Sequence, residues 1–362
     1  MASITIKYDP NLVDDPTLSD IGWLWTLRIY ASGKIPLNFE SSWPVHLLPL
    51  IEKYATNNQG KESIEFKYEF LANELDRLGS AKTINDSHLA QNLRMVADSF
   101  TLSDIERQIL EFRTIYRVHN GLEQTVDLIS NRWTDNLVHQ IIGHALAVPT
   151  TIIADALRPE SKLIKSGLLI MHSSIKSDFG RKLIALDGFV NGVQSFREKT
   201  LDIFGFLFNK ATGATLALNN FAHQKDDIDI IIKYLEQCHK HKRVGVNILL
   251  HGVPGVGKTE LARLISQELE ITAYEVSSSD FDSDDQNDQP PSRFKSYLIL
   301  QNLISQMDSG LIIFDEIEDV LPRLGLLDRP SNGHKAWINN LLETNQSPSI
   351  WISNHVNHGL HG

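Results

Sequence analysis

A glycine-rich loop between an apolar run and an amphipathic segment constrains this chain more than any other feature. Residues 252–259 read Gly-Val-Pro-Gly-Val-Gly-Lys-Thr, which fits the pattern G-x-x-x-x-G-K-T. Glycines let the backbone wrap a chain of phosphates and direct several N–H groups at it. The ammonium of Lys258 reaches the outer phosphates in such a loop, and the hydroxyl of Thr259 holds Mg²⁺. The sequence therefore predicts a phosphate-binding loop.

The segments on either side fit this prediction. Residues 246–250 are apolar and predict a strand, whereas residues 259–269 carry apolar side chains at helical spacing. A helix that begins directly after the loop adds its N-terminal dipole to the anion site. We expect the loop and the first helical turn to bind the nucleotide phosphates through Gly252, Pro254, Gly255, Val256, Gly257, Lys258, Thr259 and Glu260.

From Val244 onward the pattern of strand, loop and helix repeats. We predict strands at 246–250, 272–276, 311–314 and 350–353, and helices at 259–269, 294–307 and around 337–342. Apolar strands separated by helices form parallel sheets that are covered on both faces. The second part of the chain is therefore predicted to be an α/β domain of the P-loop NTPase type, a parallel sheet with flanking helices.

Polar side chains follow two of the predicted strands. Asp315 and Glu316 come directly after residues 311–314, at the strand end where parallel sheets bind ligands. We expect Asp315 to hold Mg²⁺ together with Thr259, and Glu316 to polarise the water that attacks the γ-phosphate. Asn354 follows the strand at 350–353, and its amide is a candidate to hydrogen-bond that water or the γ-phosphate. The alternative for Asp315 and Glu316 is a solvated strand end, and the alternative for Asn354 is an ordinary turn residue.

Two other segments contain metal-ligand residue types. Aspartates recur through the loop at 277–292, and His355, His358 and His361 occupy every third position. No glycine turn or terminal glutamate completes a calcium loop among the aspartates. A flexible tail also lacks the preorganised geometry of a metal site. We therefore favour a solvated loop and a solvated tail.

The first part of the chain, residues 1–215, is predicted to be mainly helical. Between Leu137 and Leu157 a break at Val148-Pro149 predicts a helix-turn-helix, and residues 166–171 would supply a wing strand. DNA-reading helices carry Arg, Lys, Asn or Gln towards the bases, but residues 149–157 contain no Lys or Arg and do contain Asp155. We therefore favour a winged helix near 135–185 that contacts protein or is purely structural.

Composition limits the classes of partner and compartment. The net charge of −11 argues against broad nonspecific binding to nucleic acid or to an anionic membrane. The single cysteine, Cys238, excludes an intrachain disulfide framework. The N-terminal residues lack the basic and apolar regions of a signal peptide, and no run approaches the length of a membrane span. We expect a cytoplasmic protein that binds no membrane.

In this order, the three chemistry-bearing elements resemble the AAA family of ATPases, within the wider AAA+ group. The family's Walker A is matched by GVPGVGKTELA, its Walker B by LIIFDEIEDVL, and its sensor 1 strand by WISN. The linker and helix at 216–243 include NNFAHQKDDIDIIIKYL, which looks like the family segment that helps enclose adenine. The resemblance covers about 216–354 and implies ATP and Mg²⁺ as ligands.

The resemblance also implies assembly into homo-oligomeric rings that remodel proteins or nucleic acids. In the family, the region after the second strand faces the ring's pore, so Phe294, Lys295 and Tyr297 are candidate substrate contacts. Family members continue past sensor 1 with an arginine finger, a fifth strand and a helical lid. This sequence ends at Gly362, so we expect a truncated chain with an incomplete AAA core at 244–362, impaired hydrolysis and the first strand at a sheet edge.

The function predicted from the sequence is that of an ATP-binding AAA-type ATPase that hydrolyses ATP to remodel a protein partner. Two alternatives stay open. One is a nucleotide-binding interaction or adaptor protein without turnover, and the other is a DNA-associated AAA motor, with nucleic acid the less favoured partner.

Overall fold

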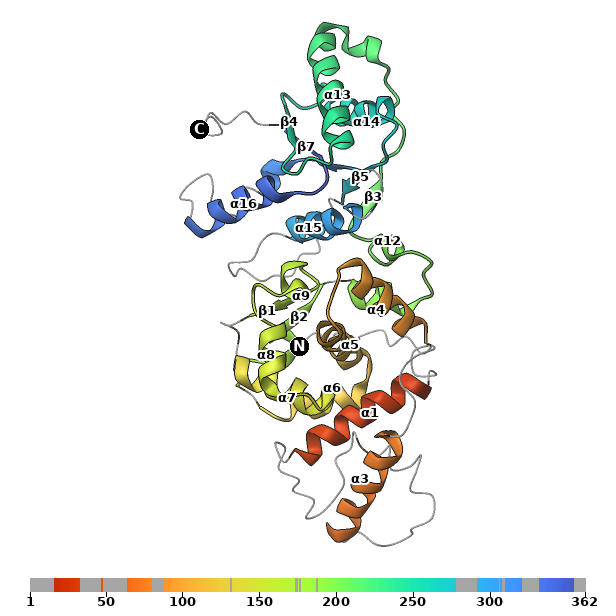
Figure 1. The fold of residues 1–362 in the computed structure, drawn as a ribbon, viewed down its shortest axis with the longest axis vertical. Coiled ribbons are helices and arrows are strands. Elements are labelled where there is room, and N and C mark those ends of the chain that lie inside the picture. The colour runs from red at the N-terminus through yellow and green to blue at the C-terminus, as the bar shows by residue number, and fades with distance from the viewer. Residues whose placement is uncertain are drawn as a thin grey trace, which may run out of the picture. The chain divides into compact units, whose positions relative to one another are not determined.

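A computed structural model describes most of the chain, in two compact units, Met1–Thr200 and Leu201–Gly362 (Figure 1). The described residues are 16–32, 47, 64–79, 87–130, 132–172, 175, 177–186, 188–277, 292–305, 307, 310–320 and 332–354. The second unit begins at Leu201, ahead of the boundary near 215 suggested by the sequence. The limits of the three sequence-based segments stay predictions.

The described part of the first unit is mainly helical. Its helices are α1 (Pro16–Ala31), α3 (Ile64–Gly79), α4 (His88–Ser99), α5 (Asp104–Val118), α6 (Asn120–Asp127), α7 (Asp135–Leu146), α8 (Thr150–Ala156), α9 (Lys162–Lys165), α10 (Phe179–Lys182) and α11 (Phe189–Gln194). Its strands, β1 (Leu169–Met171) and β2 (Leu183–Ala185), pair antiparallel.

Helix α5 lies at the centre of this unit, where it packs against α4, α6 and α8 and buries most of its apolar residues. Its start is also capped. The Ser103 hydroxyl accepts a hydrogen bond from the Glu106 N–H, and the Glu106 carboxylate accepts one in return from the Ser103 N–H. This reciprocal cap satisfies two helix-end donors. Ile109, Phe112 and Ile115 are fully buried further along the helix, so their removal from water stabilises the unit.

The predicted break at Val148-Pro149 separates α7 from α8, whose axes differ by 114°. Ala147 ends α7 in the left-handed region, with φ of 56°. Two helices followed by the β1–β2 pair stand in the order of a winged helix, and that classification stays a prediction. Among the described residues, no single helix is long and apolar enough to cross a membrane; α7 and α8 meet that criterion only as a bent pair.

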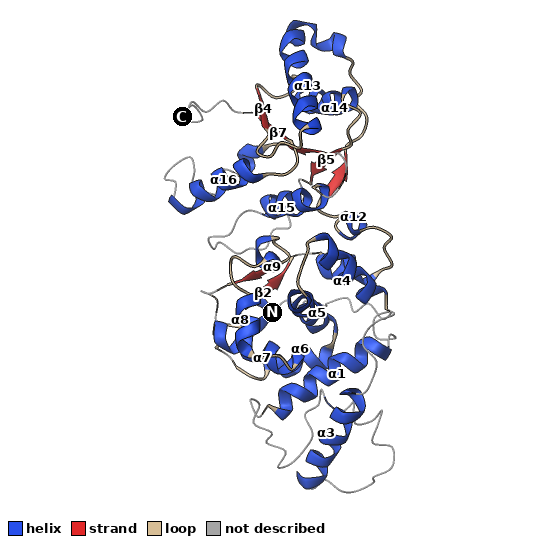
Figure 2. Ribbon diagram, in the orientation of Figure 1, coloured by secondary structure: helices blue, strands red, loops and turns tan. Residues whose placement is uncertain are grey.

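The second unit is built on a five-stranded sheet with the order β3-β5-β6-β7-β4. Figure 2 draws the strands in red. Its strands are β3 (Phe208–Lys210), β4 (Asn247–His251), β5 (Ala273–Val276), β6 (Leu311–Phe314) and β7 (Ser349–Ser353). Its helices are α12 (Thr200–Ile203, which begins at the boundary), η3 (Leu218–Gln224), α13 (Lys225–Lys240), α14 (Lys258–Glu268), α15 (Ser292–Ile304), η4 (Ile317–Asp319) and α16 (Asn332–Thr344).

The four strands predicted from the sequence are present and run parallel to one another. A fifth strand, β3, pairs antiparallel with β5; the sequence did not predict it, and it lies within the stretch predicted to be mainly helical. Three residues are too few to show a period-2 pattern. Tertiary packing holds the strand, because buried Phe208 meets the ring of Tyr274 edge to face at 5.8 Å.

Side chains alternate between the two faces of this sheet. Ile313 and Ile350 join the core formed with α13 and α14, in which Leu235 and Leu261 are buried. Phe314 and Trp351 point the other way, and α15 covers them. The sheet is therefore covered on both faces, as predicted from its apolar strands.

Helix α15 uses its aromatic residues for this second core. The ring of Phe294 stacks on Phe314 at 5.4 Å, and the ring of Tyr297 lies 4.8 Å from Trp351. Phe294 and Tyr297 are 1% and 0% exposed. The expectation that they contact a substrate in a central pore was therefore wrong, because both rings are buried against the sheet. Lys295 is half-buried.

Strand β4 lies at the edge of the sheet, as expected. Among the described strands it pairs only with β7. Leu249 at its centre is 44% exposed. The phosphate loop follows directly from this edge strand.

Candidate nucleotide-binding site

The glycine-rich loop lies between the end of β4 at His251 and the start of α14 at Lys258. Gly255 and Gly257 have φ of 82° and 88°, in the left-handed region that costs other residues free energy. Glycines in this region turn successive N–H groups towards one concave side, where an anion binds. Val253 and Val256 are more than half exposed, so the loop is open to a ligand.

The ammonium of Lys258 is held in the mouth of this loop. It donates to the carbonyl oxygens of Gly252 and Val253, at 3.0 Å each, and to Oδ1 of Asn354 at 2.9 Å. Asn354 comes from the end of β7, which pairs with β4. The structure thus places the side-chain amide of Asn354 in contact with Lys258, two residues that the sequence predicted to belong to one site. Three neutral oxygens hold the cation where a phosphate would compete for it.

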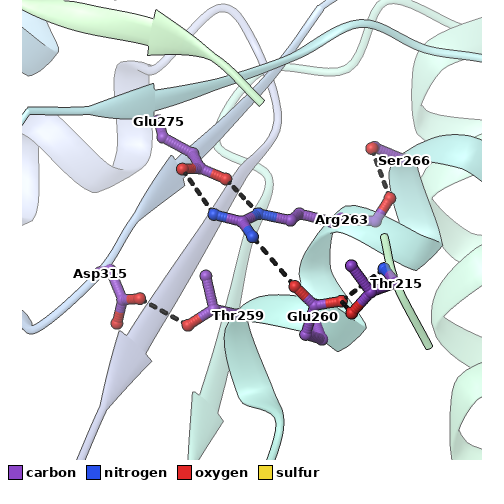
Figure 3. A network of polar contacts seen from close by, with 7 residues as sticks. All are labelled: Thr215, Thr259, Glu260, Arg263, Ser266, Glu275 and Asp315. Atoms are coloured by element: carbon purple, nitrogen blue, oxygen red, sulfur yellow. Dashed lines mark hydrogen bonds and ion pairs between the residues drawn. The ribbon is translucent and has the colours of Figure 1, made fainter. Parts of the chain in front are cut away.

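Thr259 in the first turn of α14 contacts Asp315, which directly follows β6 (Figure 3). The Thr259 hydroxyl donates to Oδ2 of Asp315 at 2.6 Å, and Oδ1 of the same carboxylate accepts from the Glu316 N–H at 2.9 Å. A hydroxyl beside an oriented carboxylate is a hard oxygen donor set of the kind that Mg²⁺ shares with substrate phosphates and water. The residues present therefore fit the predicted metal.

Glu316 follows β6 in an unusual backbone conformation. Its φ and ψ are both 53°, in the left-handed region, and its side chain is exposed. Arg293 of α15 secures the turn by donating to the carbonyl oxygens of Asp315 and Glu316, at 2.5 and 3.3 Å. The Arg293 guanidinium also lies over the Phe314 ring at 4.6 Å. A strained turn is kept where surrounding contacts over-determine it.

Glu318 is a site residue that the sequence reasoning missed. Its Oε1 accepts the Asn354 N–H at 2.9 Å, so Asn354 is held at its backbone by Glu318 and at its side chain by Lys258. Burial raises the pKa of Glu318, but hydrogen bonds from its own backbone and from Asn354 outweigh burial and leave the pKa below its usual value. The sequence pattern around Glu318 did not indicate this role, because an acid two residues after Glu316 matches no motif by itself.

The Glu260 carboxylate is turned away from the loop. It accepts from the Thr215 N–H and hydroxyl, at 2.7 and 2.8 Å, and pairs with Arg263 at 2.9 Å (Figure 3). Hydrogen bonds from Thr215 lower the pKa of Glu260. Only the backbone N–H of Glu260 is therefore available to bind a phosphate, so its predicted role in nucleotide binding is limited to the backbone.

The described residues contain no group of three or more His, Cys, Asp or Glu side chains arranged to hold a metal ion. The aspartates at 280–288 and the histidines at 355–361 lie outside the described residues.

Comparisons with known proteins agree with the geometry. Residues 248–352 match the family described as "ATPase family associated with various cellular activities (AAA)". The chain is 31% identical over 123 residues to "ATP-dependent zinc metalloprotease FtsH 2" of Phytoplasma mali (strain AT), covering 33% of this chain and 17% of the relative. It is 26% identical over 204 residues to "ATP-dependent zinc metalloprotease FtsH" of Magnetococcus marinus, covering 51% of this chain and 28% of the relative.

The chain thus spans less than a third of the length of these curated relatives. Among solved structures, a match to PCH-2 of C. elegans has a TM-score of 0.29 and 16% identity, and covers 42% of this chain and 44% of that chain.

Proposed function

Residues 248–352 of this chain form a domain of the AAA family of ATPases, and from this premise we propose that the protein binds ATP with Mg²⁺ and hydrolyses it. The observation that carries the proposal is the convergence of Lys258 and Thr259 from the start of α14 with Asp315 and Asn354 from the ends of β6 and β7. A lysine, a hydroxyl, a carboxylate and an amide at one sheet edge match the demands of a magnesium–triphosphate group.

Binding begins at the phosphate loop. Its N–H groups and the start of α14 receive the phosphates, and Lys258 exchanges its contacts with the Gly252 and Val253 carbonyls for phosphate oxygens. Thr259 and Asp315 would hold the Mg²⁺, which would supply positive charge against the negative charge of the phosphates.

Hydrolysis then depends on two side chains at the strand ends. Glu316 accepts a proton from the attacking water while the water oxygen bonds to the γ-phosphorus. The bond between that phosphorus and the β–γ bridging oxygen breaks, and ADP leaves. Asn354, held by Glu318, directs its amide at the water or the γ-phosphate. The exposed position of Glu316 leaves it accessible to solvent water.

We further propose that hydrolysis acts on a protein partner and that the active form is a homo-oligomer. Support for a protein partner comes from the matching relatives, whose names couple ATP dependence to a protease. The homo-oligomer is what the resemblance to the AAA family implies. The net charge of −11 and the absence of Lys and Arg from α8 favour protein over nucleic acid.

Two variants test binding and turnover separately. Lys258→Ala is expected to weaken the affinity for a fluorescent ATP analogue by at least about tenfold, because it removes a charge-assisted contact to phosphate. An unchanged dissociation constant rejects the site. Glu316→Gln is expected to bind ATP like the wild type and to abolish phosphate release. Equal background rates for the two proteins would favour the alternative of an adaptor that binds nucleotide without turnover.

A further inference from the structure

A short segment ahead of η3 runs beside the phosphate loop. We name residues 211–217 the strap. Its Ala211 N–H donates to the Ala273 carbonyl of β5 at 2.9 Å, and its apolar side chains pack on the core beneath α13 and α14. A Cβ placed on Gly257 would lie 3.6 Å from Leu216 of the strap and 3.3 Å from Phe221. The strap and the loop are therefore in van der Waals proximity.

One carboxylate ties the strap to the first turn of α14. Oε2 of Glu260 accepts both the Thr215 N–H and the Thr215 hydroxyl, at 2.7 and 2.8 Å. Its other oxygen accepts from Arg263 at 2.9 Å, and Arg263 in turn makes two hydrogen bonds to Glu275 of β5, at 2.6 and 3.0 Å. Figure 3 shows this chain of contacts from strap to helix to sheet.

Glu260 occupies the turn whose N–H groups would receive the phosphates, since Gly257 is the N-cap of α14. An unoriented carboxylate there would repel a triphosphate. Two donors from Thr215 and one from Arg263 instead orient the Glu260 carboxylate towards the strap and offset its negative charge. The same contact holds Leu216 next to the loop. A nucleotide with its phosphates in the loop must extend its base and ribose beyond it, and the strap places the apolar side chain of Leu216 beside Gly257 of the loop.

We propose that Glu260 is a positioning residue that latches the strap through Thr215 and thereby sets the affinity for the base-and-ribose part of a nucleotide. Glu260 does not touch the ligand with its side chain; it acts through the placement of the strap. The proposal rests on the proposed function, because it assumes that the loop holds the phosphates.

The test compares a complete nucleotide with its phosphate part alone. ATP and inorganic tripolyphosphate, each with Mg²⁺, are titrated calorimetrically into the full chain. Glu260→Ala is expected to weaken ATP binding about tenfold, as for loss of hydrogen bonds to a charged acceptor, and to leave tripolyphosphate binding within about twofold. Glu268→Ala is the matched control, because it removes an exposed acid from the other end of α14 and should change neither affinity.

Thr215→Val gives a second, milder variant. It keeps the backbone donor and loses only the hydroxyl of an exposed residue, so folding is preserved and ATP binding should weaken about threefold. Unchanged ATP affinity in both variants overturns the latch, and so does an equal loss for ATP and tripolyphosphate, which would place Glu260 in the phosphate site. A wild-type chain that binds neither ligand would instead reject the proposed function itself.

Discussion

The hydroxyl of Thr259 donates a hydrogen bond to Asp315 Oδ2 over 2.6 Å, although 56 positions separate the two residues in the chain. Thr259 lies in the first turn of α14, and Asp315 directly follows β6. Their contact places a hydroxyl and a carboxylate where a magnesium ion bound to a triphosphate requires them.

Thr259→Val should weaken the affinity for ATP in the presence of Mg²⁺ about tenfold or more, because valine has the shape of threonine without its oxygen. Thr259→Ser keeps the oxygen and should bind ATP like the wild type. Chelation of Mg²⁺ with EDTA should weaken wild-type binding and erase the difference between the valine variant and the wild type. A difference that persists in EDTA would mean that the hydroxyl serves packing and not the metal.

Arg293→Lys should lower the free energy of unfolding by about 2 kcal/mol, because lysine keeps the charge but loses the fork that reaches two carbonyl oxygens. Arg293 is 5% exposed, so water cannot replace the lost contacts. Urea unfolding followed by tryptophan fluorescence measures the change. ATP binding should weaken as well, since the turn carrying Asp315 and Glu316 loses its support; full stability with full binding would refute the clamp.

Glu318 predicts a pH dependence of stability. Its folded-state pKa is lowered, so its stabilisation is present above the unfolded value of about 4.3 and is lost as the pH falls below that value towards the folded pKa. Wild type should therefore be more stable than Glu318→Gln at pH 6, and the difference should shrink as the pH falls below 4.3. Thermal melts of both proteins between pH 3 and 7 measure it, and a constant difference would contradict the assignment.

Lys182 tests the first unit. Its ammonium is buried and donates to the His172 carbonyl at 2.8 Å and to Asp135 at 2.6 Å. Lys182→Ala should destabilise the unit by about 2 kcal/mol, because it leaves the carbonyls of His172 and Ile175 without their donor, whereas Asp135 is 45% exposed and is solvated by water. Arg158→Ala removes an exposed pair with Asp155 and should change stability by less than about 0.5 kcal/mol. Similar losses from both would mean that the burial of Lys182 has no energetic consequence.

The phosphate loop, the acids after β6 and the amide after β7 could all be predicted from the sequence. Each is a local pattern, in which an apolar strand is followed at once by polar residues, and parallel strands place such ends at one edge. The break at Pro149 was predictable for the same reason, since a helix breaker acts within a few residues.

Only the tertiary structure decided which side chains serve the site and which serve the core. Phe294 and Tyr297 are buried because the aromatic faces of β6 and β7 lie opposite α15. Arg293 and Glu318 are in the site because α15 packs on the face of the sheet that includes β6 and because β7 pairs with β6. Glu260 turns to Thr215 because the strap passes beside α14. These contacts join residues that are 22 to 45 positions apart, and a local pattern carries no information over such separations because the strand order decides which segments meet.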